Sequence, residues 1–469
     1  MTFKRDLAWQ TMELSNRSSI SYQLARYALG LKVASVPQEV IHQAKRIVLD
    51  ALGCAIGAYD APGRAMCEAT VKHLGGPQEA TVFGSGMRTS VMNATLINSF
   101  LVRFLDANDT GGGGHNSDCI SSILAISERE KAGGMDFLTS VIISYEIGAR
   151  IRESALFEAN GWLSDTRGGL SMPCALGRLM RLNEDQIANA IGLCASHSLP
   201  LNILDAHREE NSMAKNLRFG FVCYHAILCC LLAKEGFTGP VRVVEGECGM
   251  REVLFRNKMD LDCISDFSGW RILNVRHKFL PANLVSQGHV ASTLAIVKEH
   301  DLKPNDIAAV KITVGLREKL HVASCDAKKY PRNAESADHS AHFMNAIAIK
   351  ERALGPAQYS PEKFTDPVVL DLIEKIAVEV DPKLPERSYA TTTEIVTKDG
   401  RKLKKHSDSP HGLGDDPLSD KELEEKFRQL AAKYVPEKQI NKLFETFWDM
   451  DKIDDVGKLT SLMVFPSKA

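Results

Sequence analysis

The 469-residue sequence lacks several features that would each point to a particular class of protein. It contains no uninterrupted run of about 18 apolar residues, so we expect no membrane span. Its formal net charge is only −2, which gives no basic excess for binding nucleic acid. The N-terminal segment has no apolar signal core and carries Asp6 and Glu13. We therefore expect a cytoplasmic protein, with the mitochondrial matrix as the alternative compartment.

The 11 cysteines are scattered along the chain and include no CxxC pair. In a long chain without a signal peptide, such cysteines are typical of reduced, buried thiols. An iron–sulfur cluster is held by several cysteines, and spacing suited to a cluster is absent here. Any acid–base chemistry would therefore have to use acidic and basic side chains.

The length and the composition, 44% hydrophobic and 25% charged, indicate a globular protein with more than one domain. Apolar residues recur at helical spacing through most of the first 270 residues, for example in the helix expected after Pro37. Beyond Trp270 the pattern changes: residues 309–315 resemble a strand, and residues 391–407 resemble a hairpin around Asp399-Gly400.

These patterns predict a mainly α fold with two domains. We expect a large all-helical domain over residues 1–270 and a smaller α+β lid domain over residues 271–405. A C-terminal segment, 406–469, should complete the large domain. Ser419, with Glu422 three residues later, is the expected start of a helix in that segment.

The segment RFLDANDTGGGGHNSDCISSILAI, residues 103–126, is the most informative for chemistry. Asp106 and Thr110 precede four glycines, and His115 follows them before an apolar helix. Free N–H groups at a helix start beside an imidazole could hold a carboxylate. The alternative is an ordinary glycine loop followed by polar capping residues.

The segments LDANDT and GHNSD in this region resemble the signature of the MmgE/PrpD family, the 2-methylcitrate dehydratases and cis-aconitate decarboxylases. Further matching segments follow in the family's order: AKNLRFG (214–220), KEGFTGP (234–240), KFLPA (278–282), ESADHS (335–340), KDGR (398–401) and DDPLSDKELEEKF (415–427). Any one of these motifs is weak evidence, whereas their ordered combination over nearly the whole chain is specific.

The resemblance implies a homodimer with a cleft between its two domains and a small polycarboxylate substrate. It implies neither a metal nor an organic cofactor. Carried over by position, the catalytic residues would be Asp106, His115, Lys215 and His339. The residues expected to bind substrate are Thr110, Ser164, Lys278, Asn283 and Asp338.

The chemistry of these residue types suits the elimination of water from a hydroxy-tricarboxylate. The reaction needs a base, an acid and cations that hold the carboxylates. Lys215, Lys278 and His115 can supply positive charge, and His339 or Asp106 can move protons. Taken without the resemblance, Lys215 could instead be a solvated lysine and His339 an ordinary residue at a helix start.

The sequence departs from the family pattern at two positions. Relatives carry a catalytic histidine where this chain has Leu163 or Ser164, and a histidine or glutamate where it has Asn283. Candidate replacements for the missing histidine are Asp165, Arg167, His207 and Arg208.

We therefore expect a hydro-lyase that dehydrates 2-methylcitrate or an alkylcitrate without a cofactor. The alternatives are a decarboxylase of the cis-aconitate type, an epimerase of an imino-dicarboxylate, or a catalytically inactive homologue.

Overall fold

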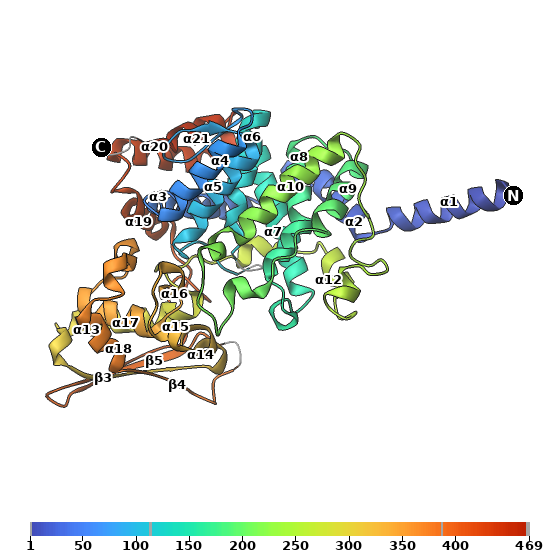
Figure 1. Cartoon of the computed structure of the whole chain (residues 1–469). Helices are drawn as coiled ribbons and strands as arrows, with labels where there is room; N and C mark the ends of the chain where they lie inside the picture. Colours follow the sequence, from blue (N-terminus) through green and yellow to red (C-terminus); the bar gives the residue numbers. More distant parts are fainter. Residues whose placement is uncertain (1, 112–114, 386–387, 466–469) are drawn as a thin grey trace.

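The computed structural model describes residues 2–111, 115–385 and 388–465. The buried apolar residues form two cores. The first takes residues from Ile20 to Val275 and from Leu418 to Phe465, and the second takes residues from Leu280 to Ile395. Figure 1 shows the corresponding bodies, a large helical one and a smaller one with a sheet on its outer side. The predicted class, mainly α with a small α+β part, is confirmed.

Helices build nearly all of the large domain. Its helices before the small domain are α2 (Ile20–Gly30), α3 (Gln38–Gly57), α4 (Pro62–Leu74), α5 (Val91–Phe104), α6 (Ile120–Glu130), α7 (Gly134–Glu153), α8 (Gly168–Leu179), α9 (Glu184–Ala195), α10 (Arg218–Lys234), α11 (Met250–Val253) and α12 (Leu261–Ser265). The helix predicted after Pro37 is α3, and its apolar positions, such as Val40, Ala44 and Val48, are fully buried. Burial of this apolar stripe, at helical spacing, stabilises α3 in the core.

One feature of the large domain departs from the all-helical expectation. Strands β1 (Ala80–Thr81) and β2 (Arg88–Thr89) form a small antiparallel pair. Each strand has two residues, which is too short for an alternating pattern to be recognised in the sequence.

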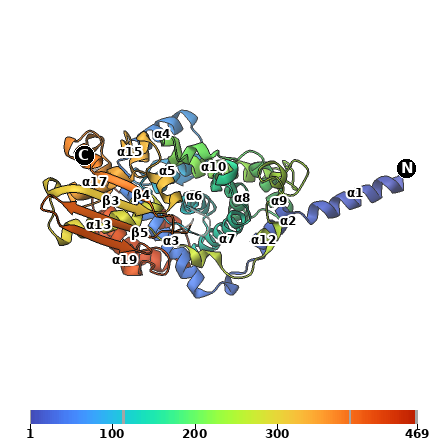
Figure 2. The same ribbon diagram turned by 90° about the horizontal axis from the view of Figure 1, so that it is seen from below.

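The small domain combines helices with a four-stranded sheet. Its elements are α13 (Gln287–Glu299), β3 (Ile307–Val314), α14 (Leu316–Val322), α15 (Asp326–Lys329), α16 (Ala334–Ala337), α17 (Ala341–Glu351), α18 (Pro367–Glu374), β4 (Ile376–Val380), β5 (Thr391–Thr397) and β6 (Lys402–Ser407). The strand order is β4-β3-β5-β6, with β4 parallel to β3 and the other pairs antiparallel. Figure 1 shows α13, α17 and α18 between this sheet and the large domain, and Figure 2 shows the strands from below.

The predicted strand and hairpin of the small domain are confirmed as β3 and as β5 with β6. Strand β4 was not predicted. It follows α18 almost directly and pairs with β3, beginning with Ile376 opposite Val310.

The chain returns to the large domain in α19 (Asp420–Ala431), α20 (Glu437–Trp448) and α21 (Gly457–Leu462). The predicted capping box of Ser419 and Glu422 is confirmed at the start of α19. This helix packs so closely on α3 that a Cβ added at Gly53 would lie 2.8 Å from the Phe427 ring. Lys426 on the same helix forms a buried ion pair with Asp50 of α3, 2.6 Å long.

Two helical segments differ from the others, one by its position and one by its apolar composition. Helix α1 (Thr2–Arg17) projects away from the body in both views (Figures 1 and 2). Among the described residues, Met213–Lys234 is the one helical stretch long and apolar enough to cross a membrane. Because 61% of its most apolar window is buried inside the protein, it is weak evidence for a membrane span.

Candidate active site

Seven of the residues predicted from the sequence come together where the two domains meet. They are Asp106, His115, Lys215 and Lys278 on the side of the large domain, and Asn283, Asp338 and His339 on the side of the small domain. We call these seven residues the junction cluster. Lys215 and Lys278 are 0% exposed, so the alternative that Lys215 is a solvated surface lysine is wrong.

Asp106 lies at the centre of the junction cluster, directly after α5. Its Oδ1 accepts hydrogen bonds from Arg103 Nη1 at 2.5 Å and Lys278 Nζ at 2.7 Å. Burial by itself would raise the pKa of this carboxyl, but Arg103, Lys278 and Lys215 together hold it well below its usual range. Asp106 is therefore a carboxylate, and it has the positive φ of 48° that non-glycine residues seldom adopt.

Lys215 joins the two domains. It lies in the short turn Met213–Leu217 that leads into α10, and its Nζ contacts both carboxylate oxygens of Asp338 at 2.6 and 2.7 Å. The same Nζ is 3.9 Å from Asp106 Oδ2 and 3.2 Å from His339 Nδ1. One buried ammonium group thus touches a carboxylate from each side of the domain junction.

His115 is held as a neutral imidazole with one free nitrogen. Its Nδ1 is 2.7 Å from the carbonyl oxygen of Asp109, which can only accept, so Nδ1 carries the proton. Nε2 is left unprotonated and lies 3.5 Å from Asp106 Oδ1. Burial, followed by the charges of Arg103 and Lys278, keeps the pKa of His115 well below its usual value.

The loop around His115 is only partly described. Thr110, predicted to bind substrate, is 6% exposed and pairs through its backbone with Arg276, N to O at 2.8 Å in both directions. Gly112 to Gly114, three of the four glycines of the proposed carboxylate cradle, lie outside the described residues. Asp109 Oδ1, and not a side chain of the helix itself, accepts from the backbone N–H of Ser117 at the start of the next helical turn.

His339 is contacted at both ring nitrogens. Asp338 Oδ1 lies 2.5 Å from Nδ1, so Nδ1 carries a proton. Asn283 accepts from the Val285 N–H through Oδ1, which turns its Nδ2 toward His339 Nε2 at 2.6 Å. In this neutral form Nε2 accepts from Asn283, and Asp205 Oδ1, 3.3 Å away, could accept once Nε2 is protonated.

Residues 164–167, where relatives carry their catalytic histidine, contact the site in part. Ser164 is half-buried and has no hydrogen bond or ion pair with the junction cluster within the described parts of the chain, so its role in substrate binding stays a prediction. Asp165 lies 3.1 Å from Arg218 Nε, and Arg167 donates to the carbonyl of His115 at 3.0 Å. Arg208 is exposed.

His207 is the remaining candidate replacement. Its ring contacts that of His321 of the small domain, with centroids 3.8 Å apart and the ring planes tilted by 54°. Burial lowers the pKa of both histidines, that of His321 to about 3 with His207 as a second cause. Both rings are near enough to Asp205 and His339 to be influenced by their charges. His207 therefore places a neutral imidazole beside the junction cluster.

Several charged residues at the site were not predicted. Arg103 orients Asp106. Arg218 orients Asp205, with its Nη1 2.7 Å from Asp205 Oδ2. Lys328 is 1% exposed, and in the described structure its side chain has no hydrogen bond or ion pair. Burial lowers the pKa of Lys328, while Asp205 raises it and Lys215 lowers it further. No local pattern marks these residues, since their sequence neighbours are ordinary turns and helix ends.

Asp106, Asp338 and His339 offer three ligand atoms within 4.8 Å of one another, as a metal site would. However, Lys215 Nζ lies 2.6 Å from Asp338 and 3.9 Å from Asp106. A metal ion would have to compete with this ammonium group for the same oxygens.

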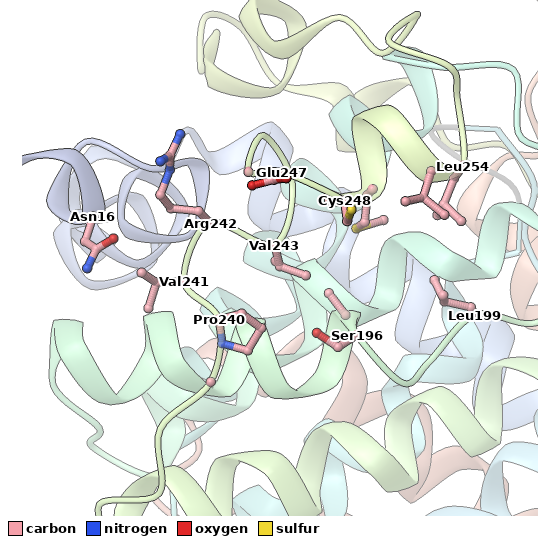
Figure 3. Close-up of a pocket in the computed structure, with 16 residues that line it drawn as sticks. Asn16, Ser196, Leu199, Pro240, Val241, Arg242, Val243, Glu247, Cys248 and Leu254 are labelled. Atoms are coloured by element: carbon pink, nitrogen blue, oxygen red, sulfur yellow. The ribbon is translucent and has the colours of Figure 1, made fainter. Parts of the chain in front are cut away.

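The pocket in Figure 3 is a different place. Its lining comes from the end of α9 and the segment 239–254, with a volume of about 550 Å³. Arg242 and Glu247 are charged residues of its lining, both labelled in Figure 3. None of the predicted site residues lines this pocket. The acid–base groups are at the domain junction instead.

Comparison with known proteins identifies the family. The family model for the MmgE/PrpD N-terminal domain matches residues 22–262, and that for the MmgE/PrpD C-terminal domain matches residues 280–450. The chain belongs to the MmgE/PrpD family.

Relatives within the family carry two kinds of name. Human cis-aconitate decarboxylase is 24% identical over 96% of this chain and 95% of its own length. The cis-aconitate decarboxylase-like protein oryM of Aspergillus oryzae is 21% identical over 95% of this chain and 97% of its own length. The 2-methylcitrate dehydratase of Salmonella typhi is 24% identical over 80% and 77%. These relatives support a family that processes tricarboxylates and leave the reaction of this MmgE/PrpD protein open.

Proposed function

We propose that this MmgE/PrpD protein is a cofactor-independent hydro-lyase that dehydrates 2-methylcitrate or another alkyl-substituted citrate to the corresponding aconitate. The observation that carries the proposal is a pair of imidazoles on opposite oxygens of one buried carboxylate. His115 Nε2 is 3.5 Å from Asp106 Oδ1, and His339 Nδ1 is 3.8 Å from Asp106 Oδ2. An elimination needs one group that takes a proton and another that gives one.

The junction cluster also contains the positive charge that a tricarboxylate needs. Lys215 and Lys278 pair with Asp338 and Asp106 in the ligand-free protein, and substrate carboxylates would share or replace these partners. Lys328 is buried beside them with no anion of its own among the described residues. A buried charge without a partner is costly, which favours an anionic ligand at this place.

The reaction then uses the two imidazoles in different protonation states. His115 Nε2 takes the proton from the carbon next to the hydroxyl-bearing carbon, and Asp106 stabilises the resulting imidazolium. The electrons of the C–H bond form the double bond while the C–O bond breaks. His339 acts after it has taken up a proton at Nε2, where Asp205 Oδ1 replaces Asn283 as its partner. It gives this proton to the leaving hydroxide, which departs as water, and returns to its neutral form.

Decarboxylation of a cis-aconitate-type substrate is the second candidate. The observation in its favour is that the cis-aconitate decarboxylases match nearly the full length of both chains, whereas the dehydratase of Salmonella typhi matches about four-fifths. The same lysines could hold the carboxylates that remain, and one imidazole could protonate the carbanion.

The test is incubation of metal-stripped protein with 2-methylcitrate, citrate and cis-aconitate, followed by mass spectrometry of the products. Loss or gain of one water supports the proposed dehydration, and loss of carbon dioxide replaces it with the decarboxylase. If no mass changes, the hydro-lyase proposal is rejected for these substrates. Deuterium uptake from heavy water would then identify an epimerase, and its absence an inactive homologue.

We also propose that the protein forms a homodimer through the outer face of α10. Phe221, Leu228 and Leu232 lie on this face and are 49%, 40% and 36% exposed. Large apolar side chains gathered on one helix face are typical of an interface. The variant Phe221→Asp should elute as a monomer in size-exclusion chromatography with light scattering, and an unchanged dimer in that variant would rule out this face.

A further inference from the structure

An apolar cavity lies between the two domains, directly behind the junction cluster. Its volume is about 590 Å³, within the range of roughly 300–1,000 Å³ usual for small-molecule sites. One wall comes from the large domain, where α3, α5 and α19 end. The opposite wall comes from α16 and from the segment 356–364 of the small domain.

The cavity shares its walls with the junction cluster. Phe104 and Leu105, which line it, directly precede Asp106, and Met213 lies two residues before Lys215. Glu335 is among the lining residues, and its carbonyl oxygen lies 3.4 Å from Lys215 Nζ. Residues that line the cavity thus adjoin Asp106 and Lys215, although none of the seven residues of the junction cluster is itself part of the lining.

Tyr359 forms another part of the shared wall. Its ring lines the cavity, and its hydroxyl donates to the carbonyl oxygen of Pro281 at 2.5 Å. The next carbonyl, that of Ala282, accepts from Lys278 Nζ at 3.2 Å. Burial, together with the charges of Asp338 and Asp106, raises the pKa of Tyr359 well above its usual value. This hydroxyl stays neutral and adds no charge to the cavity.

The charged groups around the cavity already have partners. Asp60 is bonded to Lys433 and Tyr434, Arg332 to Glu210 at 2.6 Å, and Glu335 to Asn216 at 3.0 Å. The rest of the lining is largely apolar, with Phe104, Leu105, Phe364 and Leu430 among its side chains. Since Lys433 and Arg332 already pair with Asp60 and Glu210, most of the remaining wall is apolar, and an alkyl chain would gain by leaving water there.

We propose that this cavity binds the alkyl chain of the substrate, so that the preferred substrate is a citrate carrying a chain longer than methyl. The inference rests on the proposed function, since the junction cluster has to hold the carboxylates at the mouth of the cavity. Each methylene that leaves water should improve kcat/KM about fourfold, or roughly sixtyfold from a methyl to a butyl substituent.

The test measures kcat/KM and the ligand-induced rise in Tm for a series of citrates with methyl, butyl and hexyl substituents. The variant Leu430→Trp fills the cavity from α19 and should lower the butyl-to-methyl ratio of kcat/KM at least tenfold. Ala357→Trp, at an exposed position of the opposite wall, provides a second filling variant if Leu430→Trp folds poorly. Leu29→Trp, on the surface of α2 and outside the cavity, is the matched control and should leave the ratio unchanged.

The outcomes separate this inference from the proposed function. Turnover that is flat or falls with chain length, or a ratio that Leu430→Trp and Ala357→Trp do not change, overturns the alkyl site and leaves the dehydratase intact. A rise in Tm that grows with chain length, without any turnover, supports the alkyl site and rejects the dehydratase. Neither turnover nor a length-dependent rise in Tm rejects both.

Discussion

Lys278 and Lys426 are two buried lysines in contact with each other, yet their surroundings differ. Lys426 Nζ has Asp50 as its ion-pair partner and also donates to the carbonyls of Ala107 and Lys278, at 2.6 to 2.8 Å. Lys278 shares Asp106 with Arg103 and Lys215. A lysine with saturated hydrogen bonds stabilises the fold, whereas one that competes for a carboxylate is available to a ligand.

The electrostatics of the two lysines reflect this difference. Burial lowers the pKa of Lys278 to about 8 in spite of Asp106. Burial would also lower the pKa of Lys426, but the charge of Asp50 outweighs it and the pKa is raised. Groups whose pKa is displaced by burial beside other charges are typical of active sites.

Replacing Lys278 should have the largest effect on activity. In Lys278→Met the volume is nearly kept and the positive charge is lost, so we expect kcat/KM to fall by about a thousandfold. The free energy of unfolding should change little, since Asp106 keeps Arg103 and Lys215 as partners. Steady-state kinetics and urea unfolding measure the two quantities, and activity within tenfold of the parent would remove Lys278 from the site.

Replacing Lys426 should do the reverse. Lys426→Met leaves Asp50 buried without its cation, and we expect a loss of about 3–5 kcal/mol in the free energy of unfolding. Because Lys426 contacts the junction cluster through the backbone carbonyl of Lys278 alone, among the described residues, kcat/KM per folded molecule should stay within about tenfold. A large loss of activity in a stable Lys426→Met protein would show that the two lysines do not differ as described.

The smallest predicted effect is a pH dependence. Lys278 is charged below its pKa of about 8 and loses its proton above it. Above about pH 8, kcat/KM should therefore fall by about tenfold per pH unit, since the free enzyme's protonation governs this constant. Lys278→Arg keeps its charge to much higher pH and should remove the alkaline limb.

Lys426→Arg is the control for the pH dependence, because the surroundings of Lys426 raise the pKa of this lysine instead of lowering it. The alkaline limb should remain in that variant. If the limb persists in Lys278→Arg as well, another group causes it.

Much of the fold follows from local patterns in the sequence. The periodicity after Pro37 predicted α3, the Asp399-Gly400 turn predicted β5 with β6, and Ser419 with Glu422 predicted the start of α19. The β1–β2 pair has no such signal, because its two-residue strands are too short for a periodicity. Strand β4 does alternate, with Ile376 and Val378 buried between exposed residues, but this five-residue run almost directly follows a helix and was not recognised.

The site was predicted by motif rather than by local physics. The segments shared with the family identified Asp106, Lys215 and Asp338 as site residues. The structure brings these three together although each is more than 100 residues from the next along the chain. Arg103, Asp205 and Lys328 were missed, since only the folded chain reveals which charges share a buried space. Ser164 was carried over from the pattern where relatives have their histidine, and it remains outside the junction cluster.

The central claim is that the junction cluster is a tricarboxylate site. Isothermal titration of tricarballylate, a saturated tricarboxylate with no hydroxyl to lose, measures binding without chemistry. We predict that the parent protein binds it and that Lys215→Met binds it at least a hundredfold more weakly, with the fold intact by circular dichroism. Equal affinity in the two proteins would contradict the account, because the ligand would then be held somewhere other than at Lys215.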